Sequence, residues 1–250
     1  MALGGEGGRP GRPEAQVALS LPLHAEKRRV VEAMFDRIAP RYDRLNGLIS
    51  LGAHRRWKRA AVAELALAPG AVVLDLACGT GDLAAEAARA GARAVGVDLS
   101  AGMLREARRR LPATTLVRAA GEALPLADAS VDAVACGFAL RNFVDLAAVL
   151  REVARVLRPE GRVALVEIDR PASSLVRRAH GLYFERLVPL VGALLSDRFA
   201  YAYLPSSAAY LPDAAALGAL LAAAGLGAVR KRTFMGGAAQ LVTAVRRPAC

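Results

Sequence analysis

A glycine-containing turn follows a short apolar run in the first half of the sequence. The segment VLDLACGTGDLA contains Gly79, Thr80 and Gly81, and the spacing to Ala84 fits the G-x-G-x-x-A pattern of nucleotide-cofactor loops. Glycines permit a tight turn and a close approach of ligand to the amino end of the following helix. The pattern is weak alone, but an expected strand before it and an expected helix after it strengthen it. We therefore expect Gly79, Thr80 and Gly81 to bind a nucleotide-like cofactor.

Two carboxylates help to choose between cofactors. Asp75 ends the expected strand, four residues before the first glycine. It would repel the pyrophosphate of NAD, whereas the ammonium and sulfonium groups of S-adenosylmethionine favour a nearby negative charge. Asp98 ends the next expected strand and can accept hydrogen bonds from the ribose hydroxyls of either cofactor. The pair favours S-adenosylmethionine over NAD, and the alternative role of Asp75 is to cap the loop.

A cation and an amide end a third apolar run, AVACGFALRNF. Arg141 and Asn142 stand between Leu140 and Phe143, after an expected strand at residues 131–138. The carboxyl ends of parallel strands form the ligand-binding edge of such sheets, so the pair should lie beside the cofactor loops. We expect the guanidinium of Arg141 to point into the pocket and to stabilise negative charge there. The alternative is a surface salt bridge, with Asp145 as a partner.

Alternating strands and helices position these residues. Strands are expected at residues 71–77, 93–98, 114–119, 131–138, 162–168, 227–234 and 240–245, and helices at 82–90, 100–110, 145–157 and 213–224. Pro159 and Gly161 should form a stop and a turn before the fifth strand. The MGGA segment between the last two strands suits a hairpin. The prediction is an α/β fold with a Rossmann-like, doubly wound, mostly parallel seven-stranded sheet and one antiparallel edge strand.

The rest of the chain fits around one such domain. Residues 1–24 are rich in glycine and proline and are expected to be a disordered tail without a signal peptide. Residues 25–247 should form a single domain, with N-terminal helices at 25–68. A helical insertion at 173–212, kinked at Pro189, should form a lid over the substrate.

Composition limits the partners. The net charge is +11, which attracts nucleic acid or anionic lipid, although arginines on solvated helix faces account for it as well. No stretch alternates basic and aromatic residues, and aromatics are only 5% of the chain, so no nucleic-acid partner is expected. The three cysteines are scattered, which predicts no metal site and agrees with a cytoplasmic location. No apolar run is long enough to span a membrane.

Five stretches, taken with the residues above, resemble the ubiquinone/menaquinone biosynthesis C-methyltransferases among the class I S-adenosylmethionine-dependent methyltransferases. They are MFDRIAPRYDRLNGLISLGAHRRWKR, VLDLACGTGDLA, GVDLSAGMLREAR, GEALPLADASVDAVACGFALRNF and LREVARVLRPEGRVALVE. The first and fourth are specific to this family, and the others are common to many methyltransferases. The resemblance covers residues 34–245 in order.

The resemblance implies C-methylation of a polyprenylated quinol ring, with S-adenosylmethionine as the methyl donor. Conversion of demethylmenaquinol to menaquinol is the favoured reaction, and the benzoquinol precursor of ubiquinone or another lipophilic phenol is the alternative. Matched to the family motifs, Thr80, Asp98, Ala120, Gly121 and Gly137 are cofactor contacts.

The mechanism expected from these residues begins with loss of a proton from the acceptor's hydroxyl. Arg141 would stabilise the phenolate, and Asn142 would orient the hydroxyl or a water. Tyr42 would close over the methyl and sulfonium groups through its electron-rich ring, unless it merely packs under the N-terminal helices. Asp43 and His54 are weaker candidates for relaying the proton.

The sequence also departs from the family pattern. Ala120 stands where Asp or Asn is usual, and Ala202 and Ser206 replace Arg and Glu in the expected lid. These departures leave the acceptor's identity open and allow a first rival, a non-catalytic S-adenosylmethionine-binding module. A second rival, an RNA methyltransferase, is favoured by the basic charge, but the site lacks a catalytic cysteine or an Asn/Asp-Pro-Pro-Tyr-type motif. The expected helix at 175–195 and the basic charge would allow peripheral contact with an anionic membrane, at the inner face of the cell membrane. The alternative is that this helix only covers the site.

Overall fold

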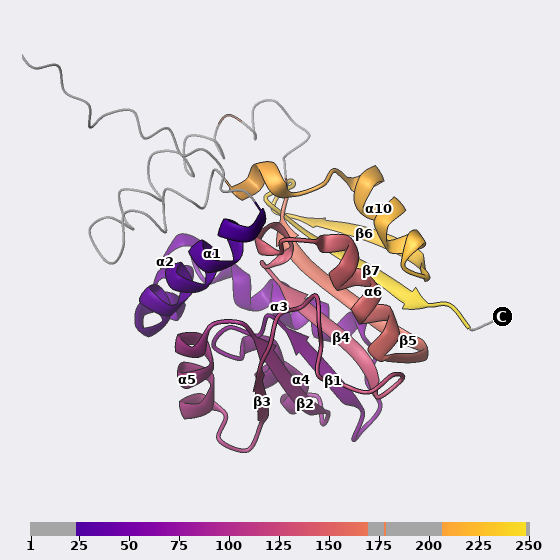
Figure 1. The fold of residues 1–250 in the computed structure, drawn as a ribbon, viewed down its shortest axis with the longest axis horizontal. Helices are drawn as coiled ribbons and strands as arrows, with labels where there is room; N and C mark the ends of the chain where they lie inside the picture. Colours follow the sequence, from indigo (N-terminus) through magenta and orange to yellow (C-terminus); the bar gives the residue numbers. More distant parts are fainter. Residues whose placement is uncertain (1–23, 170–177, 179–206, 249–250) are drawn as a thin grey trace, which may run out of the picture.

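A seven-stranded sheet forms the centre of the computed structural model, which describes residues 24–169, 178 and 207–248. The strands are β1 Val72–Leu76, β2 Arg93–Asp98, β3 Thr115–Arg118, β4 Val131–Gly137, β5 Leu157–Ile168, β6 Leu226–Phe234 and β7 Ala239–Arg246. Their order is β3-β2-β1-β4-β5-β7-β6, as Figure 1 shows. Of the tail expected at 1–24, only His24 is described, and it begins a helix. Of the lid insertion expected at 173–212, only residues 178 and 207–212 are described, and the departures at Ala202 and Ser206 lie outside the described residues.

The predicted fold class is confirmed, and the antiparallel strand lies one place in from the edge. β7 runs antiparallel to both of its neighbours, β5 and β6. The edge strand β6 is therefore parallel to the rest of the sheet, and its last residue, Phe234, ends at the same edge as β1, β2 and β4. The hairpin turn after Phe234 has Met235, Gly236 and Gly237 at positive φ.

Helices cover both faces of the sheet. On one face lie α6 Leu146–Val156 and α10 Ala214–Ala223, and on the other lie α3 Ala53–Glu64 and α4 Asp82–Arg89 (Figure 1). Each face of the sheet has its own apolar core, and alternate residues of β1 contribute to each. Leu74 and Leu76 pack with α6 and α10, while Val73 packs with α3 and α4. Burial on both faces explains why the central strands β1 and β4 are mostly apolar.

The predicted turn at Pro159 and Gly161 is replaced by a bulge within β5. Val131 pairs with Leu157 and Ala133 pairs with Arg162, so residues 158–161 all lie opposite Asp132. Glu160 takes a positive φ of 64°, which lets the extra residues loop out while the strand continues on either side. The prediction that a turn precedes the strand is therefore wrong, because pairing with β4 already begins at Leu157.

The N-terminal helices form a third, smaller core against helix α5 Ala101–Arg110. They are α1 His24–Ile38, a short 3-10 turn η1 Ala39–Arg41, α2 Tyr42–Ile49 and α3. Met34, Ile38 and Leu45 pack on Met103 of α5. Asp36 of α1 accepts hydrogen bonds from the Ser100 hydroxyl at 2.6 Å and from the Gly102 amide at 2.7 Å. None of the helices in the described ranges is long and apolar enough to cross a membrane.

Candidate active site

One pocket opens at the carboxyl ends of the parallel strands, between the strand-end loops and helix α1. Seven of the residues singled out by sequence line it: Tyr42, Gly79, Asp98, Ala120, Gly121, Gly137 and Asn142. The other four, Asp75, Thr80, Gly81 and Arg141, are not among its lining residues. The structure thus brings most of the predicted site together and places the rest behind the pocket wall.

Asp98 both holds the glycine turn and faces the pocket. Its carboxylate accepts the Gly79 amide at 2.7 Å on one oxygen and the Ser100 amide at 2.8 Å on the other. Burial raises the pKa of Asp98, the backbone hydrogen bonds oppose that rise, and nearby Asp36 adds to it. Each carboxylate oxygen keeps a lone pair for a further donor, such as a ribose hydroxyl.

The charges around the pocket fit a cationic nucleoside. Three carboxylates, Glu32, Asp98 and Glu122, lie among the described lining residues, and Arg28 is the single cation. The sulfonium and ammonium of S-adenosylmethionine would be attracted to such a surface, whereas a pyrophosphate would be repelled. The residues present therefore fit S-adenosylmethionine, and Asp98 and the Gly79 backbone are suited to hold it.

Ala120 and Gly121 lie in the wall next to Phe143. A Cβ added at Gly121 would come within 2.9 Å of the Phe143 ring, so only glycine fits there. Glu122, which follows, accepts the Val144 amide at 3.1 Å and lies 3.6 Å from the guanidinium of Arg28. The side chain of Glu122 is thus engaged with the loop after β4 and with α1.

Asp75 supports the cofactor loop from beneath. One carboxylate oxygen accepts the Ala84 amide of α4 at 2.7 Å, and the other is buried without a partner among the described residues. Burial raises the pKa of Asp75 to about 7, with the Ala84 hydrogen bond and Lys58 opposing the rise. The arrangement matches the loop-capping alternative, and no contact of Asp75 with the pocket is present.

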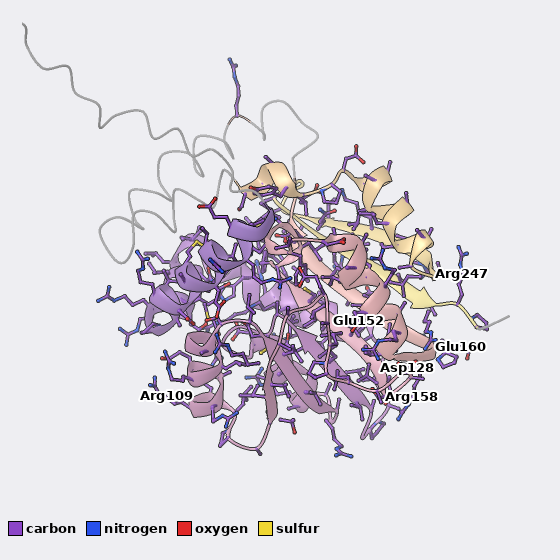
Figure 2. All side chains as sticks on the ribbon, viewed as in Figure 1. Arg109, Asp128, Glu152, Arg158, Glu160 and Arg247 are labelled. Carbon is purple, nitrogen blue, oxygen red and sulfur yellow. The ribbon has the colours of Figure 1, made fainter. Side chains whose placement is uncertain are left out.

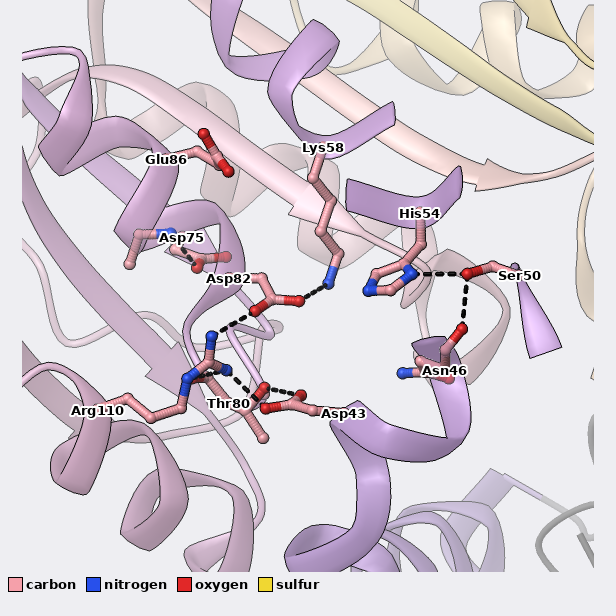
Figure 3. A network of polar contacts seen from close by, with 12 residues as sticks. Asp43, Asn46, Ser50, His54, Lys58, Asp75, Thr80, Asp82, Glu86 and Arg110 are labelled. Atoms are coloured by element: carbon pink, nitrogen blue, oxygen red, sulfur yellow. Dashed lines mark hydrogen bonds and ion pairs between the residues drawn. The ribbon is translucent and has the colours of Figure 1, made fainter. Parts of the chain in front are cut away.

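A polar network ties the glycine loop to helices α2, α3 and α5 (Figure 3). Arg110 donates to Asp43 at 2.7 Å, to the Thr80 carbonyl at 3.0 Å and to Asp82 at 2.8 Å. The Thr80 hydroxyl donates to Asp43 at 2.6 Å, and Lys58 pairs with Asp82 at 2.8 Å. Thr80 therefore fixes the position of α2, the helix that carries Tyr42.

The charges of this network stabilise one another. Burial alone would lower the pKa of Lys58, but Asp82 outweighs burial and raises it. Burial would raise the pKa of Asp82, but Lys58 and Arg110 hold it well below its usual range. His54 lies close by in Figure 3, with Nδ1 2.6 Å from the Ser50 hydroxyl, and burial lowers its pKa. His54 and Asp43 are not among the pocket-lining residues.

Arg141 is turned away from the expected direction. Its guanidinium forms a buried ion pair with Glu167 at the end of β5, donates to the Phe138 carbonyl at 3.0 Å and donates from Nε to the Ser207 hydroxyl at 3.1 Å. A buried cation needs a counter-charge, and Glu167 supplies it. The expectation that the cation points into the pocket is corrected accordingly, and a surface salt bridge with Asp145 is absent too, since Asp145 caps α6.

Arg141 and Asn142 were both expected in the pocket, and of the two only Asn142 lines it. It lines the wall with Phe138 and Phe143, and its Nδ2 lies 3.5 Å from the Phe138 carbonyl. Its Oδ1 is buried and has no hydrogen-bond partner among the described residues. Buried acceptors are usually satisfied, so this oxygen is suited to a donor brought by a ligand.

Tyr42 lies over the glycine turn. A Cβ placed on Gly79 would be 4.0 Å from the Tyr42 ring. Phe35 of α1 meets the Tyr42 ring edge-on, with the two ring centres 6.0 Å apart. Tyr42 thus both lines the pocket and packs with the N-terminal helices.

Helix α1 supplies a wall that the sequence reasoning missed. Arg28, Val31, Glu32 and Phe35 all line the pocket, although residues 25–68 were expected only to form N-terminal helices. Their spacing of three and four residues is a signal that could have marked them as one face. Lys27 anchors this helix, donating to the Phe143 carbonyl at 2.7 Å with its ammonium 3.8 Å from the centre of the Tyr210 ring.

Comparison with known proteins gives a family. A model described as the ubiE/COQ5 methyltransferase family matches residues 23–246. The ubiquinone/menaquinone biosynthesis C-methyltransferase UbiE of Syntrophotalea carbinolica is 43% identical over 219 residues, 85% of this chain and 92% of that protein. The demethylmenaquinone methyltransferase of Roseiflexus sp. is 42% identical over 232 residues, 91% and 98% of the two chains. The demethylmenaquinone methyltransferase of Mycobacterium marinum is 44% identical over 212 residues, which are 84% of this chain and 90% of that protein.

Solved structures share the fold. A chain from the complex between the Haloferax volcanii Trm112 methyltransferase activator and a methyltransferase has a TM-score of 0.63 at 20% identity, covering 86% of this chain and 98% of that one. An S-adenosylmethionine-dependent methyltransferase of Thermotoga maritima has a TM-score of 0.61 at 20% identity, covering 87% and 100%. The family model and the relatives span most of this sequence, so the chain belongs to the ubiE/COQ5 methyltransferase family and is an S-adenosylmethionine-dependent methyltransferase.

Proposed function

We propose that this enzyme methylates a ring carbon of a polyprenylated quinol, with demethylmenaquinol as the acceptor. The observation that carries the proposal is the unpartnered Oδ1 of Asn142, buried in the pocket wall between Phe138 and Phe143. A quinol brings hydroxyl donors to this acceptor and a flat apolar ring to the two aromatic side chains, whereas an oxidised quinone has only acceptors. Relatives named demethylmenaquinone methyltransferase support the naphthoquinol ring.

S-adenosylmethionine supplies an electrophilic methyl group when it is bound. Asp98 would accept hydrogen bonds from its ribose, the Gly79 backbone would lie against it, and Ala120 and Gly121 would form the adenine side of the pocket. Tyr42 closes the wall above the glycine turn with its electron-rich ring. These residues bind and orient the donor and exclude water from the reacting atoms.

The acceptor ring becomes nucleophilic when its hydroxyl loses a proton. Asn142 accepts a hydrogen bond from that hydroxyl and so orients the ring carbon toward the methyl group. Arg141 contributes positive potential from behind Asn142, at a strength moderated by Glu167, and both side chains meet at the Phe138 carbonyl. The positive potential of Arg141 favours the phenolate once the hydroxyl proton has passed to water, whereas the hydrogen bond to Asn142 orients the hydroxyl before that transfer.

The proposal also includes the setting of the enzyme. Residues 25–247 form one methyltransferase domain, which the family match over residues 23–246 supports. The acceptor is a lipid, so we place the enzyme in the cytoplasm, in peripheral contact with the inner face of the cell membrane.

Transfer of radiolabelled methyl from S-adenosylmethionine tests the proposal. The enzyme is given demethylmenaquinol, the same compound as the oxidised quinone, the benzoquinol precursor of ubiquinone, and total RNA. Label should enter the reduced naphthoquinol and not the oxidised form. Equal labelling of both redox forms would contradict the role of Asn142, and preference for the benzoquinol would overturn the ring assignment. Label in RNA alone, or cofactor binding without any transfer, would overturn the proposed function.

A further inference from the structure

The three most exposed large apolar side chains of the described residues are Leu51, Met235 and Leu48, which are 81%, 61% and 48% exposed. Leu48 is the second-last residue of α2, Leu51 lies between α2 and α3, and Met235 begins the hairpin turn after β6. We call these three residues the apolar rim. Apolar side chains this exposed are costly in water and need a reason when they gather at one place.

The rim lies at the edge of the sheet where the pocket opens. β6 is parallel to β4 and β5, so Met235 follows its carboxyl end, the edge at which the pocket is built. Trp57 of α3 stacks on Phe234 with ring centres 6.0 Å apart, which brings the start of α3 beside the end of β6. Tyr42, on the same helix as Leu48, lines the pocket itself.

Two members of the rim hold a strained backbone. Leu51 has a φ of 48° and Met235 a φ of 47°, in the left-handed region that favours glycine and asparagine. Both side chains are exposed, so burial of apolar surface does not offset the cost of this strain. A turn selected for stability alone would be better served by Gly or Asn at both positions, which points to a role outside the folded chain.

Four exposed arginines flank the rim. Arg44 shares a face of α2 with Leu48, four residues on, and Arg41 immediately precedes the helix at its N-cap. Arg55 and Arg56 stand in the first turn of α3, where positive charge is unfavourable to the helix dipole. The single acidic residue between positions 41 and 59 is Asp43, and it pairs with Arg110. The four arginines therefore have no counter-charge within their own segment.

We infer that the apolar rim and its four arginines dock on an anionic lipid bilayer, with the pocket mouth facing the membrane. Leucine and methionine side chains would enter the apolar layer while the arginines meet lipid phosphates. This surface rests on the proposed function in one respect: a prenylated quinol lies in the bilayer, and docking at this edge would shorten its path to Asn142.

Flotation with vesicles tests the surface directly and needs no activity. The wild-type protein should float with phosphatidylglycerol-containing vesicles at low salt, and much less at high salt or with pure phosphatidylcholine. Arg55→Gln with Arg56→Gln should weaken binding by roughly fivefold per arginine. The matched control is Arg93→Gln with Arg247→Gln, two exposed arginines at the opposite edge. Arg93 stands where β2 begins, and Arg247, labelled in Figure 2, follows the end of β7. Equal losses in both pairs, or no binding by the wild type, would overturn the inference.

The apolar rim is tested by Leu51→Asn with Met235→Asn. Asparagine suits a positive φ, so the melting temperature should stay the same or rise while vesicle binding falls several-fold. Val229→Thr is the control, since Val229 is 41% exposed on β6 and lies outside the rim. Wild-type binding by the Asn variant would overturn the role of the rim.

Activity separates this inference from the proposed function. The Asn variant should methylate a water-soluble quinol without a prenyl chain at the wild-type rate, and a vesicle-embedded prenylated quinol more slowly. If the wild type methylates no quinol at all, the proposed function fails while the flotation result stands. If both acceptors are methylated at wild-type rates, the surface has no part in substrate delivery and that part of the inference fails.

Discussion

Arg141 and Glu167 form an ion pair that is almost fully removed from water. The side chain of Glu167 is 0% exposed and that of Arg141 is 6% exposed. Glu167 also accepts the Ile168 amide at 2.9 Å on the same oxygen, and its other oxygen is buried without a partner among the described residues. The pair thus joins the loop that contains Asn142 to the end of β5.

Replacing Arg141 with alanine should destabilise the fold by about 3–5 kcal/mol, because it leaves the carboxylate of Glu167 buried and uncompensated. The double variant Arg141→Met with Glu167→Leu removes both charges and should recover most of this loss. Urea unfolding of Arg141→Met, Glu167→Leu and the double variant measures the coupling. Additive effects of the two substitutions would show that the charges do not stabilise each other.

The same double variant isolates the chemical role of Arg141. If Arg141 favours the phenolate, the stable double variant should bind S-adenosylmethionine like the wild type and transfer methyl about 100-fold more slowly. Calorimetry with the cofactor and the radiolabel assay measure the two quantities. Full transfer activity in the double variant would reduce Arg141 to a structural residue.

Asn142→Ala should lower kcat/KM for the quinol about tenfold, or roughly 1.4 kcal/mol, through loss of a hydrogen bond to the hydroxyl. Cofactor affinity should be unchanged. Asn46→Ala is a matched control on α2, because Asn46 accepts the Ser50 hydroxyl through its backbone carbonyl, which alanine keeps. Loss of cofactor binding in the Asn142 variant would place this residue on the donor side of the pocket instead.

Arg110→Gln should weaken S-adenosylmethionine binding about tenfold, roughly 1.4 kcal/mol. The reason is that Arg110 joins Asp43, Asp82 and the Thr80 carbonyl, and its loss frees α2 from the glycine loop (Figure 3). Arg109→Gln is the neighbouring control, since Arg109 pairs with Glu106 within the same helix. Similar affinities of the two variants would mean that the network does not shape the cofactor site.

Asp75 makes stability depend on pH in a definite direction. Burial raises its pKa to about 7 in the folded protein, while an unfolded chain has about 3.9. The folded state therefore binds the proton more tightly, and the contribution of Asp75 to stability falls as pH rises from about 4 to about 7. Asp75→Asn keeps an acceptor for Ala84 and should be more stable than the wild type near pH 8, with the difference shrinking toward about pH 4.

Urea unfolding across this pH range measures the effect. Asp82→Asn is a control of opposite sign, because Lys58 and Arg110 lower the pKa of Asp82 despite its burial. The contribution of Asp82 to the free energy of unfolding is present above about pH 4 and is lost in acid. A pH-independent difference between Asp75→Asn and the wild type would show that Asp75 does not titrate in this range.

Local patterns were enough to predict the strands and the cofactor turn. The apolar run before Gly79 and the carboxylate of Asp98 can each be recognised from the sequence of a single βα unit. The structure brings both to the pocket. The bulge at residues 158–161 was missed because proline and glycine indicate a break without indicating that pairing with β4 continues across it.

Contacts between distant segments could not be predicted in this way. Glu167 lies inside an apolar strand, 26 residues after Arg141, and nothing near either residue in sequence indicates that they pair. Asp75 was expected to face the cofactor because it stands beside the glycines, but alternation along β1 and the Ala84 amide turn it beneath the loop. In both cases burial of a charge, which only the fold determines, decided the orientation.

The contact of Asp36 with Ser100 and Gly102 also bears on the order in which the enzyme is assembled. These partners follow Asp36 by 64 and 66 residues, so α1 is synthesised roughly 3 to 13 seconds before its docking site, at about 5–20 residues per second. During that interval the apolar face of α1 lacks its packing partner Met103. The helix that walls the pocket is synthesised before its docking site, so α1 can make these contacts only when translation has passed the start of α5.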